Sequence, residues 1–100
     1  MYRPLPECLT IRESQIDGLG LFATEDIPAH TDLGMCHFYD SDGTLHRTPL
    51  GAFYNHNDDA NCIKTWDGEH CWHLVTKRHI TKDEELTVNY TFYKIFKKNA

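Results

Sequence analysis

The stretch Ala-Phe-Tyr-Asn-His-Asn-Asp-Asp-Ala-Asn-Cys, from Ala52 to Cys62, is the segment around which the rest of the chain is arranged. Two aromatic residues lead into an adjacent amide and imidazole, Asn55 and His56, and a second amide follows at Asn61. The segment has neither a helical period nor a simple alternation of apolar and polar residues. We therefore predict a loop that either caps its neighbours or binds a ligand.

Length and charge limit the classes of protein to which the chain can belong. With 100 residues, it has room for one domain with a hydrophobic core and for no second domain. The formal net charge is −5, from 10 basic and 15 acidic residues. Direct binding to nucleic acid needs a basic footprint, so this balance argues against it. An acidic surface instead favours a basic peptide or ligand.

No segment of the sequence has the pattern of a signal peptide or a membrane span. The first six residues contain no apolar targeting region, and no apolar run approaches the length that crosses a bilayer. We therefore expect a soluble intracellular protein with no membrane partner. In such a compartment, the four cysteines are expected to be reduced thiols rather than a disulfide framework.

Short apolar segments separated by turn residues predict a mainly β architecture with little helix. Asp67-Gly68 lies between two of these segments and predicts a hairpin with a two-residue turn. The sequence shows no repeat, low-complexity segment or interdomain linker. The expected strands are 9–12, 33–39, 63–66, 69–76 and 87–90, and residues 44–51 are expected to be irregular.

Gly18-Leu19-Gly20 lies inside an apolar run, where glycine weakens a strand unless a ligand or another backbone comes close. A dinucleotide site is excluded, because Phe22 stands where a third glycine is needed and Pro28 curtails the following helix. Two interpretations remain. The glycines form a bulge in a strand, or they let a ligand lie against the backbone.

The histidines and cysteines give a weak signal for metal. A zinc site would need His70, Cys71 and His73 with Cys62 or Cys36, but a strand places His70 and Cys71 on opposite faces. We therefore predict no metal site and keep a small zinc protein as a separate hypothesis. Other polar residues are expected at the surface: His30, His37, His46, His79 and the run Asp83-Glu84-Glu85.

Three motifs occur in a fixed order along the chain. Gly18-Leu19-Gly20-Leu21-Phe22-Ala23 is similar to Gly-x-Gly-Leu/Val-Phe-Ala, and residues 55–62 are similar to Asn-His-Ser-x-x-Pro-Asn-Cys/Ala. Residues 80–90 are similar to Ile-x-x-Gly-Glu-Glu-Leu-Thr-x-Asp/Asn-Tyr. Together they resemble the SET domain of S-adenosylmethionine-dependent protein lysine methyltransferases. The resemblance covers about residues 9–93, and the length is close to that of the minimal stand-alone viral type.

The resemblance implies a fold and an activity. The fold would be a single minimal SET domain over residues 1–100, with several small curved sheets and a flexible tail at 94–100. A C-terminal pseudoknot would bring the strand of Tyr90 beside Asn55 and His56. The activity would be methyl transfer from S-adenosylmethionine to a lysine amine of a basic protein segment such as a histone tail, with S-adenosylhomocysteine as the product.

The resemblance also implies a role for each matching residue. Tyr90 would be the catalytic residue, with its hydroxyl orienting the amine and the transferring methyl, and Asn61 would tie the loop to the chain. The cofactor would be held by Gly18, Leu19, Gly20, Leu21, Phe22, Asn55, His56 and Tyr90. An aromatic channel that desolvates the amine and lowers its pKa would be lined by Phe38, Tyr39, Phe53, Tyr54 and Phe92.

Departures from the family pattern keep an alternative open. Asn57 stands in place of serine, Ala60 in place of proline, and Asp83 in place of a turn glycine. No cysteine cluster follows Tyr90, so the aromatic tail or a second subunit in a homodimer would have to cover the cofactor. The alternative is a catalytically degenerate SET-fold binding module. A host nuclear location is expected if the target is a histone, and a cytoplasmic one otherwise.

Overall fold

Eight short strands and one helical turn make up the regular structure of residues 5–89, which are the residues that the computed structural model describes. The mainly β prediction with little helix is therefore confirmed. The elements in chain order are β1 (Leu9–Glu13), β2 (Leu19–Ala23), β3 (Asp32–Tyr39), β4 (Leu45–Arg47), α1 (Pro49–Ala52), β5 (Asn55–His56), β6 (Cys62–Trp66), β7 (Cys71–Thr76) and β8 (Glu85–Val88).

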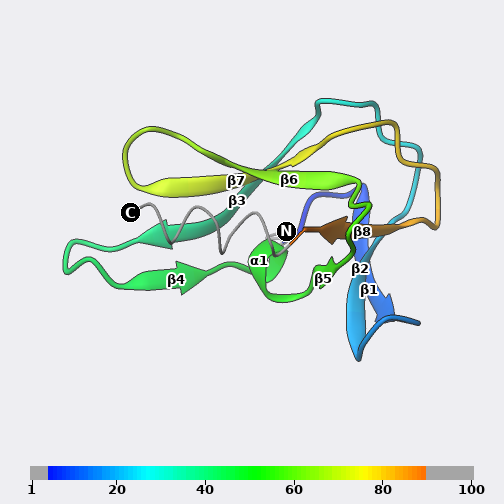
Figure 1. Ribbon diagram of the computed structural model, residues 1–100, viewed down its shortest axis with the longest axis horizontal. Helices are drawn as coiled ribbons and strands as arrows, with labels where there is room; N and C mark the ends of the chain where they lie inside the picture. The colour runs from blue at the N-terminus through cyan, green and yellow to red at the C-terminus, as the bar shows by residue number, and fades with distance from the viewer. Residues whose placement is uncertain (1–4, 90–100) are drawn as a thin grey trace.

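The strands follow one another laterally in the order β1-β2-β8-β6-β7-β3-β4, and β5 pairs with β8 outside this path. Strand β8 is antiparallel to β2 but parallel to both β5 and β6. In Figure 1, the β1–β2 hairpin lies at one end of the molecule and the loops of the β3–β4 and β6–β7 hairpins lie at the other. Strand β8 lies between β2 and β6 and so links the β1–β2 hairpin to the other strands. No helix among residues 5–89 is long and apolar enough to cross a membrane.

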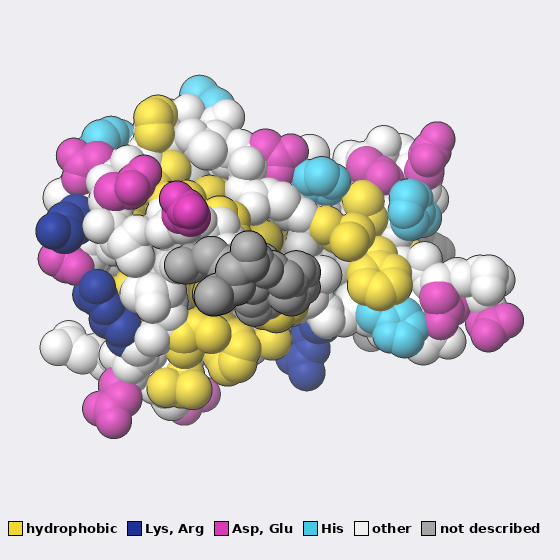
Figure 2. Space-filling model, turned by 180° about the vertical axis from the view of Figure 1, so that it is seen from behind, with side chains coloured by type: hydrophobic (Ala, Val, Ile, Leu, Met, Phe, Trp, Pro, Cys, Tyr) yellow, Lys and Arg dark blue, Asp and Glu magenta, His cyan; other side chains and the backbone are white. Residues whose placement is uncertain are grey.

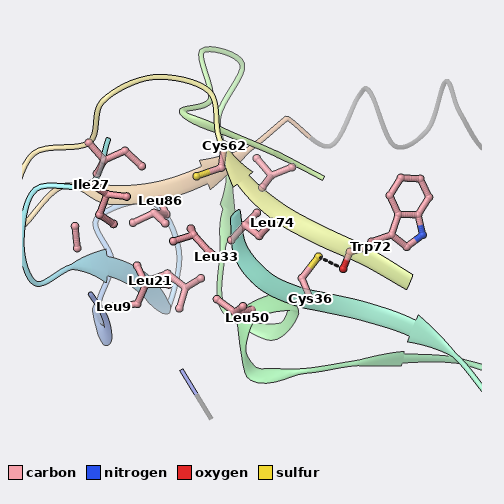
Figure 3. Packing of buried hydrophobic residues seen from close by; sticks show 13 residues of the cluster. Leu9, Leu21, Ile27, Leu33, Cys36, Leu50, Cys62, Trp72, Leu74 and Leu86 are labelled. Carbon is pink, nitrogen blue, oxygen red and sulfur yellow. Dashed lines mark hydrogen bonds between the residues drawn. The ribbon is translucent and has the colours of Figure 1, made fainter. Parts of the chain in front are cut away.

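The core lies between the two ends, where side chains from most of the strands meet. Leu21 of β2, Leu74 of β7 and Leu86 of β8 have no exposed surface. Figure 3 shows Leu21, Leu33, Leu74 and Leu86 directed toward one another from different strands. Each buried leucine of this kind contributes roughly 2 kcal/mol of transfer free energy. The core thus holds together segments that are far apart in the sequence.

The β6–β7 hairpin is confirmed, but the prediction of a two-residue turn at Asp67-Gly68 is wrong. The strands end at Trp66 and resume at Cys71, which leaves a four-residue loop. The Asp67 carboxylate is the physical reason, because its Oδ1 accepts the backbone N–H groups of Glu69, His70 and Cys71 at 2.8, 2.9 and 3.1 Å. An aspartate that binds the following amides in this way stabilises a wider turn.

The expectation that residues 44–51 are irregular is also wrong. Residues 45–47 form β4, and Pro49 opens α1, since proline at the first helical position lacks only an N–H that would go unused there. Gly51 lets α1 lie directly on β3, because any Cβ at this position would overlap the carbonyl oxygen of Cys36. His37 on β3 is buried, which corrects the expectation that it lies at the surface.

Candidate active site

The first and second motifs of the sequence meet at the side chain of Asn55. Its amide nitrogen lies 3.1 Å from the carbonyl oxygen of Asp17 and 3.3 Å from that of Leu19. The same nitrogen donates to the Glu85 carboxylate at 2.8 Å. Asn55 therefore joins the glycine-containing β2 segment to β8, and all three motifs contribute to one location.

The two glycines of Gly18-Leu19-Gly20 differ in their surroundings. Any Cβ at Gly20 would overlap the Glu85 carboxylate, which also accepts the Ser14 hydroxyl at 2.8 and 2.9 Å. Gly18 has a left-handed φ of 45°, and no atom of residues 5–89 lies where its Cβ would be. The close approach predicted for these glycines therefore exists at Gly20, where the approaching group is a side chain of this protein. Among the described residues, none fills the space beside Gly18.

The loop of the second motif lies beside the strand that leads to Tyr90. Residues Asn55 and His56 pair in parallel with Thr87 and Val88. The imidazole Nε2 of His56 lies 2.9 Å from an oxygen of Asp58, which holds the loop in shape. The expected adjacency is thus present as far as Val88. Tyr90 and Phe92 lie outside the described residues, so their assigned roles stay predictions.

Asn61 ties the loop to β8, as predicted. The side chain is 2% exposed, and its Oδ1 accepts the Thr87 backbone N–H at 2.8 Å. Its amide donates to the Glu85 carbonyl at 2.8 Å and to the Glu84 carboxylate at 3.1 Å. A buried amide with all of these partners fixes the loop on one register of β8.

The expectation that Asp83-Glu84-Glu85 is a solvated turn holds only for its first residue. Asp83 is exposed and has a left-handed φ of 72°, a conformation that aspartate tolerates better than most residues. Glu84 accepts hydrogen bonds from the Thr81 backbone and the Asn61 amide and forms an ion pair with Arg78 at 2.9 Å. Partial burial raises the pKa of Glu84, but these bonds and the charge of Arg78 outweigh it and hold the pKa below its ordinary value.

Three of the residues predicted to line a channel each form a separate ring contact. Tyr54 faces His37 at a centroid distance of 6.2 Å, and Phe38 stacks on His46 at 5.1 Å. Tyr39 packs edge-on against Trp66 at 6.1 Å. Phe53 is partly buried against the core. These aromatic side chains are thus near the end of β3 and the start of β5, and among residues 5–89 their ring contacts do not form one continuous stack.

Sequence reasoning missed two buried polar residues in this area. Lys64 on β6 is 7% exposed, and burial lowers the pKa of its amine to about 8. His37 is 6% exposed, and burial followed by the charges of Lys64 and Arg47 lowers the pKa of its imidazole to about 4. The signal for Lys64 was its spacing, because Cys62, Lys64 and Trp66 share one face of a strand.

Only part of the zinc ligand set considered from the sequence is brought together among residues 5–89. Cys62 pairs with Thr76 at one end of the β6–β7 hairpin, whereas Cys71 follows the loop at the other end. Strand geometry puts about 15 Å between these positions. His73 instead lies 3.0 Å from Asp32. Ligand atoms of His70 and Cys71 come within 4.8 Å of each other and of Asp67. The expectation that a strand places His70 and Cys71 on opposite faces is therefore wrong, because His70 lies in the loop before β7.

A model of the SET domain family matches residues 34–91, which include the Asn-His loop and β8. The chain belongs to the SET domain family. The match covers more than half of the sequence, and the observed strand order with β8 next to β5 places two of the family's motifs side by side. No curated protein sequence matches this chain.

Solved SET structures superpose on this fold at low sequence identity. A candidate histone methyltransferase of Plasmodium falciparum is 20% identical with a TM-score of 0.69, covering 86% of this chain and 95% of that one. The methyltransferase domain of human PR domain-containing protein 2 is 18% identical with a TM-score of 0.67, covering 84% and 77%. A humanized mutant of Chaetomium thermophilum Polycomb Repressive Complex 2, bound to the inhibitor GSK126, is 20% identical with a TM-score of 0.66, covering 82% of this chain and 14% of that chain.

Proposed function

We propose that this SET domain is an S-adenosylmethionine-dependent protein-lysine N-methyltransferase. The observation that carries the proposal is the meeting of three motifs, in which Asn55 contacts the Gly18–Gly20 segment and β5 runs beside β8. This arrangement puts the predicted cofactor residues next to the strand that leads to Tyr90. The minimal viral type and the extent of the domain over residues 1–100 stay predictions.

The groups around Asn55 suit the amino-acid end of the cofactor. The carbonyl oxygens of Asp17 and Leu19 and the carboxylate of Glu85 are acceptors for an ammonium group. The side chains of Ile16 and Leu19 are 48% and 49% exposed and offer an apolar surface to a flat base. S-adenosylmethionine supplies an electrophilic methyl group on a sulfonium when it is bound.

The remaining requirements of the reaction fall on the protein. A lysine amine has an ordinary pKa of about 10.4, so it must lose a proton before it can act as a nucleophile. Aromatic walls such as Tyr54 and Tyr39 would desolvate the amine and lower this pKa. Tyr90 would orient the amine through its hydroxyl, because a one-step displacement depends on alignment of the reacting atoms.

The charge of the protein favours a basic substrate segment such as a histone tail. The net charge is −5, and Figure 2 shows acidic side chains at many points along the edge of one face, with Lys and Arg side chains grouped at one side. Such a field raises the encounter rate with lysine-rich peptides. We place this activity in the cytoplasm or nucleus, with a homodimer as the form in which a second subunit covers the cofactor.

Substitution of the tyrosine tests the proposal. Tyr90→Phe should lower turnover by about 100-fold or more on labelled histones or cell lysate, since it removes one positioned hydroxyl. Calorimetry should still detect cofactor binding, because the other contacts remain. Turnover equal to that of the unmodified protein would contradict the assignment of Tyr90.

A second candidate function is supported by the contacts of Asn55. Its amide already has three acceptors within the chain, and the Glu85 carboxylate fills the space beside Gly20. A degenerate module that binds peptides without a cofactor would need no vacancy there. Calorimetry with S-adenosylmethionine separates the two candidates, because the degenerate module should show no heat of binding.

A further inference from the structure

The loop between β6 and β7 brings together three potential metal ligands of different chemistry. Asp67, His70 and Cys71 offer a carboxylate oxygen, an imidazole nitrogen and a thiol sulfur, and these atoms lie within 4.8 Å of one another. In Figure 1, this loop lies at the opposite end of the molecule from the β1–β2 hairpin, which carries two of the acceptors around Asn55. The cluster is therefore separate from the candidate active site.

The Asp67 carboxylate is held in one orientation by the backbone of its own loop. Its Oδ1 accepts the N–H groups of Glu69, His70 and Cys71 at 2.8, 2.9 and 3.1 Å. Its other oxygen, Oδ2, lies 2.9 Å from the Cys71 sulfur and 3.8 Å from the Nδ1 of His70. Carboxylates that bind metals are themselves hydrogen-bonded in this way, because the bonds aim the remaining oxygen at the ion. Oδ2 is thus already directed at the two other ligands.

The imidazole of His70 is close to two carboxylates without being bonded to either. Its Nδ1 lies 3.8 Å from an oxygen of Asp67 and 3.9 Å from an oxygen of Glu69. Both distances exceed the length of a hydrogen bond, which is about 2.7–3.2 Å. Among residues 5–89, the ring has no hydrogen-bond partner. A nitrogen that is surrounded by acceptors but lies beyond bonding distance leaves room for a cation between them.

The distances in the cluster fit a tetrahedral zinc ion. Zinc lies about 2.0–2.3 Å from its nitrogen, oxygen and sulfur ligands, which puts the ligand atoms roughly 3.5 Å from one another. The two separations from Oδ2, 2.9 and 3.8 Å, lie on either side of this value. The side chain of His70 is 58% exposed, so it can move toward an ion without disturbing the core. Cys71 is buried at the start of β7, and its carbonyl accepts the Asp67 N–H at 3.0 Å, so the backbone closes the loop around the ligands.

We propose that Asp67, His70 and Cys71 bind a zinc ion, with Glu69 or water as the fourth ligand. Imidazole nitrogen and thiolate sulfur select zinc over calcium and magnesium, which take oxygen ligands. On binding, a bond forms between zinc and the Cys71 sulfur, and the thiol proton leaves for solvent. The prediction of no metal site depended on placing His70 and Cys71 on opposite faces of a strand, whereas His70 precedes β7. The zinc site does not depend on the proposed methyltransferase activity.

An ion in this loop would stabilise the adjoining end of β3. The carbonyl of His70 accepts the Tyr39 N–H at 2.8 Å. Trp66, which precedes Asp67, packs against the Tyr39 ring at a centroid distance of 6.1 Å. The ligand set is thus connected to the last residue of β3. Because the unfolded chain has no preformed site, zinc favours the folded state and should raise the melting temperature.

The test uses the purified full chain, freed of metal with a chelator. Calorimetry should detect one Zn²⁺ per chain. His70→Ala should weaken Zn²⁺ affinity about tenfold or more, because it removes one ligand from an exposed position. His79→Ala is the matched control, since its side chain is also 58% exposed and lies 3.6 Å from a carboxylate. Its affinity should stay within about twofold of that of the unmodified protein.

Cobalt reports whether the sulfur is a ligand. Co²⁺ added to the metal-free chain should give the absorption band of thiolate-to-metal charge transfer. Cys71→Ser should remove this band, whereas Cys8→Ser should keep it. Cys8 is the control because it is a partly buried free thiol that precedes β1. Excess Zn²⁺ should raise the melting temperature of the unmodified protein and leave that of His70→Ala unchanged.

Three outcomes would overturn the zinc site. The first is equal Zn²⁺ affinity in His70→Ala and His79→Ala, or no binding at all. The second is Co²⁺ binding without a thiolate band, and the third is binding of several ions per chain with no rise in melting temperature, which would be adventitious. None of these measurements uses S-adenosylmethionine, so each of these outcomes leaves the methyltransferase proposal unaffected. Because His70 is exposed, its variant decides the matter even if Cys71→Ser does not fold.

Discussion

Asn55 and Asn61 are six residues apart in one loop, yet their amides have different surroundings. Asn61 is 2% exposed, and its partners are largely backbone groups of β8. Asn55 is only partly buried, and its partners border the open space at Gly18. The Asn61 amide completes the fold, whereas the Asn55 amide lies where a ligand can reach it. Burial and the kind of partner, rather than residue type, therefore separate a structural amide from a candidate binding amide.

The largest effect on stability is expected for Asn61→Ala. The substitution leaves the Thr87 N–H and the Glu85 carbonyl without side-chain partners in a buried setting. The free energy of unfolding should fall by about 3 kcal/mol, measured by urea denaturation. Asn57→Ala is the control, because Asn57 is exposed and its side chain accepts one local hydrogen bond. A loss of unfolding free energy for Asn61→Ala no larger than for Asn57→Ala would contradict the structural role of Asn61.

Gly20→Ala should have the next largest effect on stability, because it disturbs the contacts of Asn55. The added methyl group displaces the Glu85 carboxylate, which loses its bonds to Ser14 and Asn55. Because the carboxylate is at the end of a flexible side chain, we expect a loss of about 1–2 kcal/mol in thermal or urea unfolding. Gly20 is not in the left-handed region, so any loss comes from overlap rather than from backbone strain. A free energy of unfolding equal to that of the unmodified protein would show that contact with Glu85 is unimportant.

Asn55→Ala should separate stability from binding. Its bonds are partly exposed, so the free energy of unfolding should change by about 1 kcal/mol or less. Affinity for S-adenosylmethionine should fall about tenfold or more, measured by calorimetry, because the amide lies at the proposed cofactor contact. A large loss of stability with unchanged affinity would make Asn55 a second structural amide like Asn61.

The smallest effect on stability is expected from Glu84, whose carboxylate accepts a hydrogen bond from the Asn61 amide. Its folded-state pKa is lowered, so it contributes stability above its ordinary pKa and loses that contribution as the pH falls through the folded value. Glu84→Gln should reduce stability at pH 7 by less than about 1 kcal/mol and should flatten the acid limb of the stability curve below about pH 4.5. An acid limb identical to that of the unmodified protein would show that the Arg78 and Asn61 contacts do not stabilise the charge.

The strands of this fold were predictable because alternation of apolar and polar residues records which face is buried. The expected segments 9–12 and 33–39 correspond closely to β1 and β3. The four-residue hairpin loop was not predictable from Asp67-Gly68, because the side chain of Asp67 binds three amides and widens the turn. Helix α1 was missed because four residues are too short to show a helical period.

The candidate site was predictable only where a motif records a local conformation. The contact of Asn55 with the Gly18–Gly20 segment follows from the order of motifs, and the structure shows it. The burial of His37 depends on pairings across three strands, which no local pattern reveals, whereas the spacing of Lys64 from Cys62 could have placed it on a buried face. The role of Glu85 was missed for the same reason, since its carboxylate is held by residues from distant segments. The catalytic assignment of Tyr90 stays a prediction.

The position of β8 has a consequence for how the protein is made. This strand pairs with β2, β5 and β6, so its partners precede it by up to about sixty residues. Contacts over such separations are formed slowly, because the intervening chain must be ordered first. During synthesis, the β1–β2 and β3–β4 hairpins can form early, but Leu21, Leu74 and Leu86 cannot close the core until β8 has left the ribosome. The nascent chain therefore exposes its apolar strands until β8 has emerged, and this is the interval in which aggregation competes with folding.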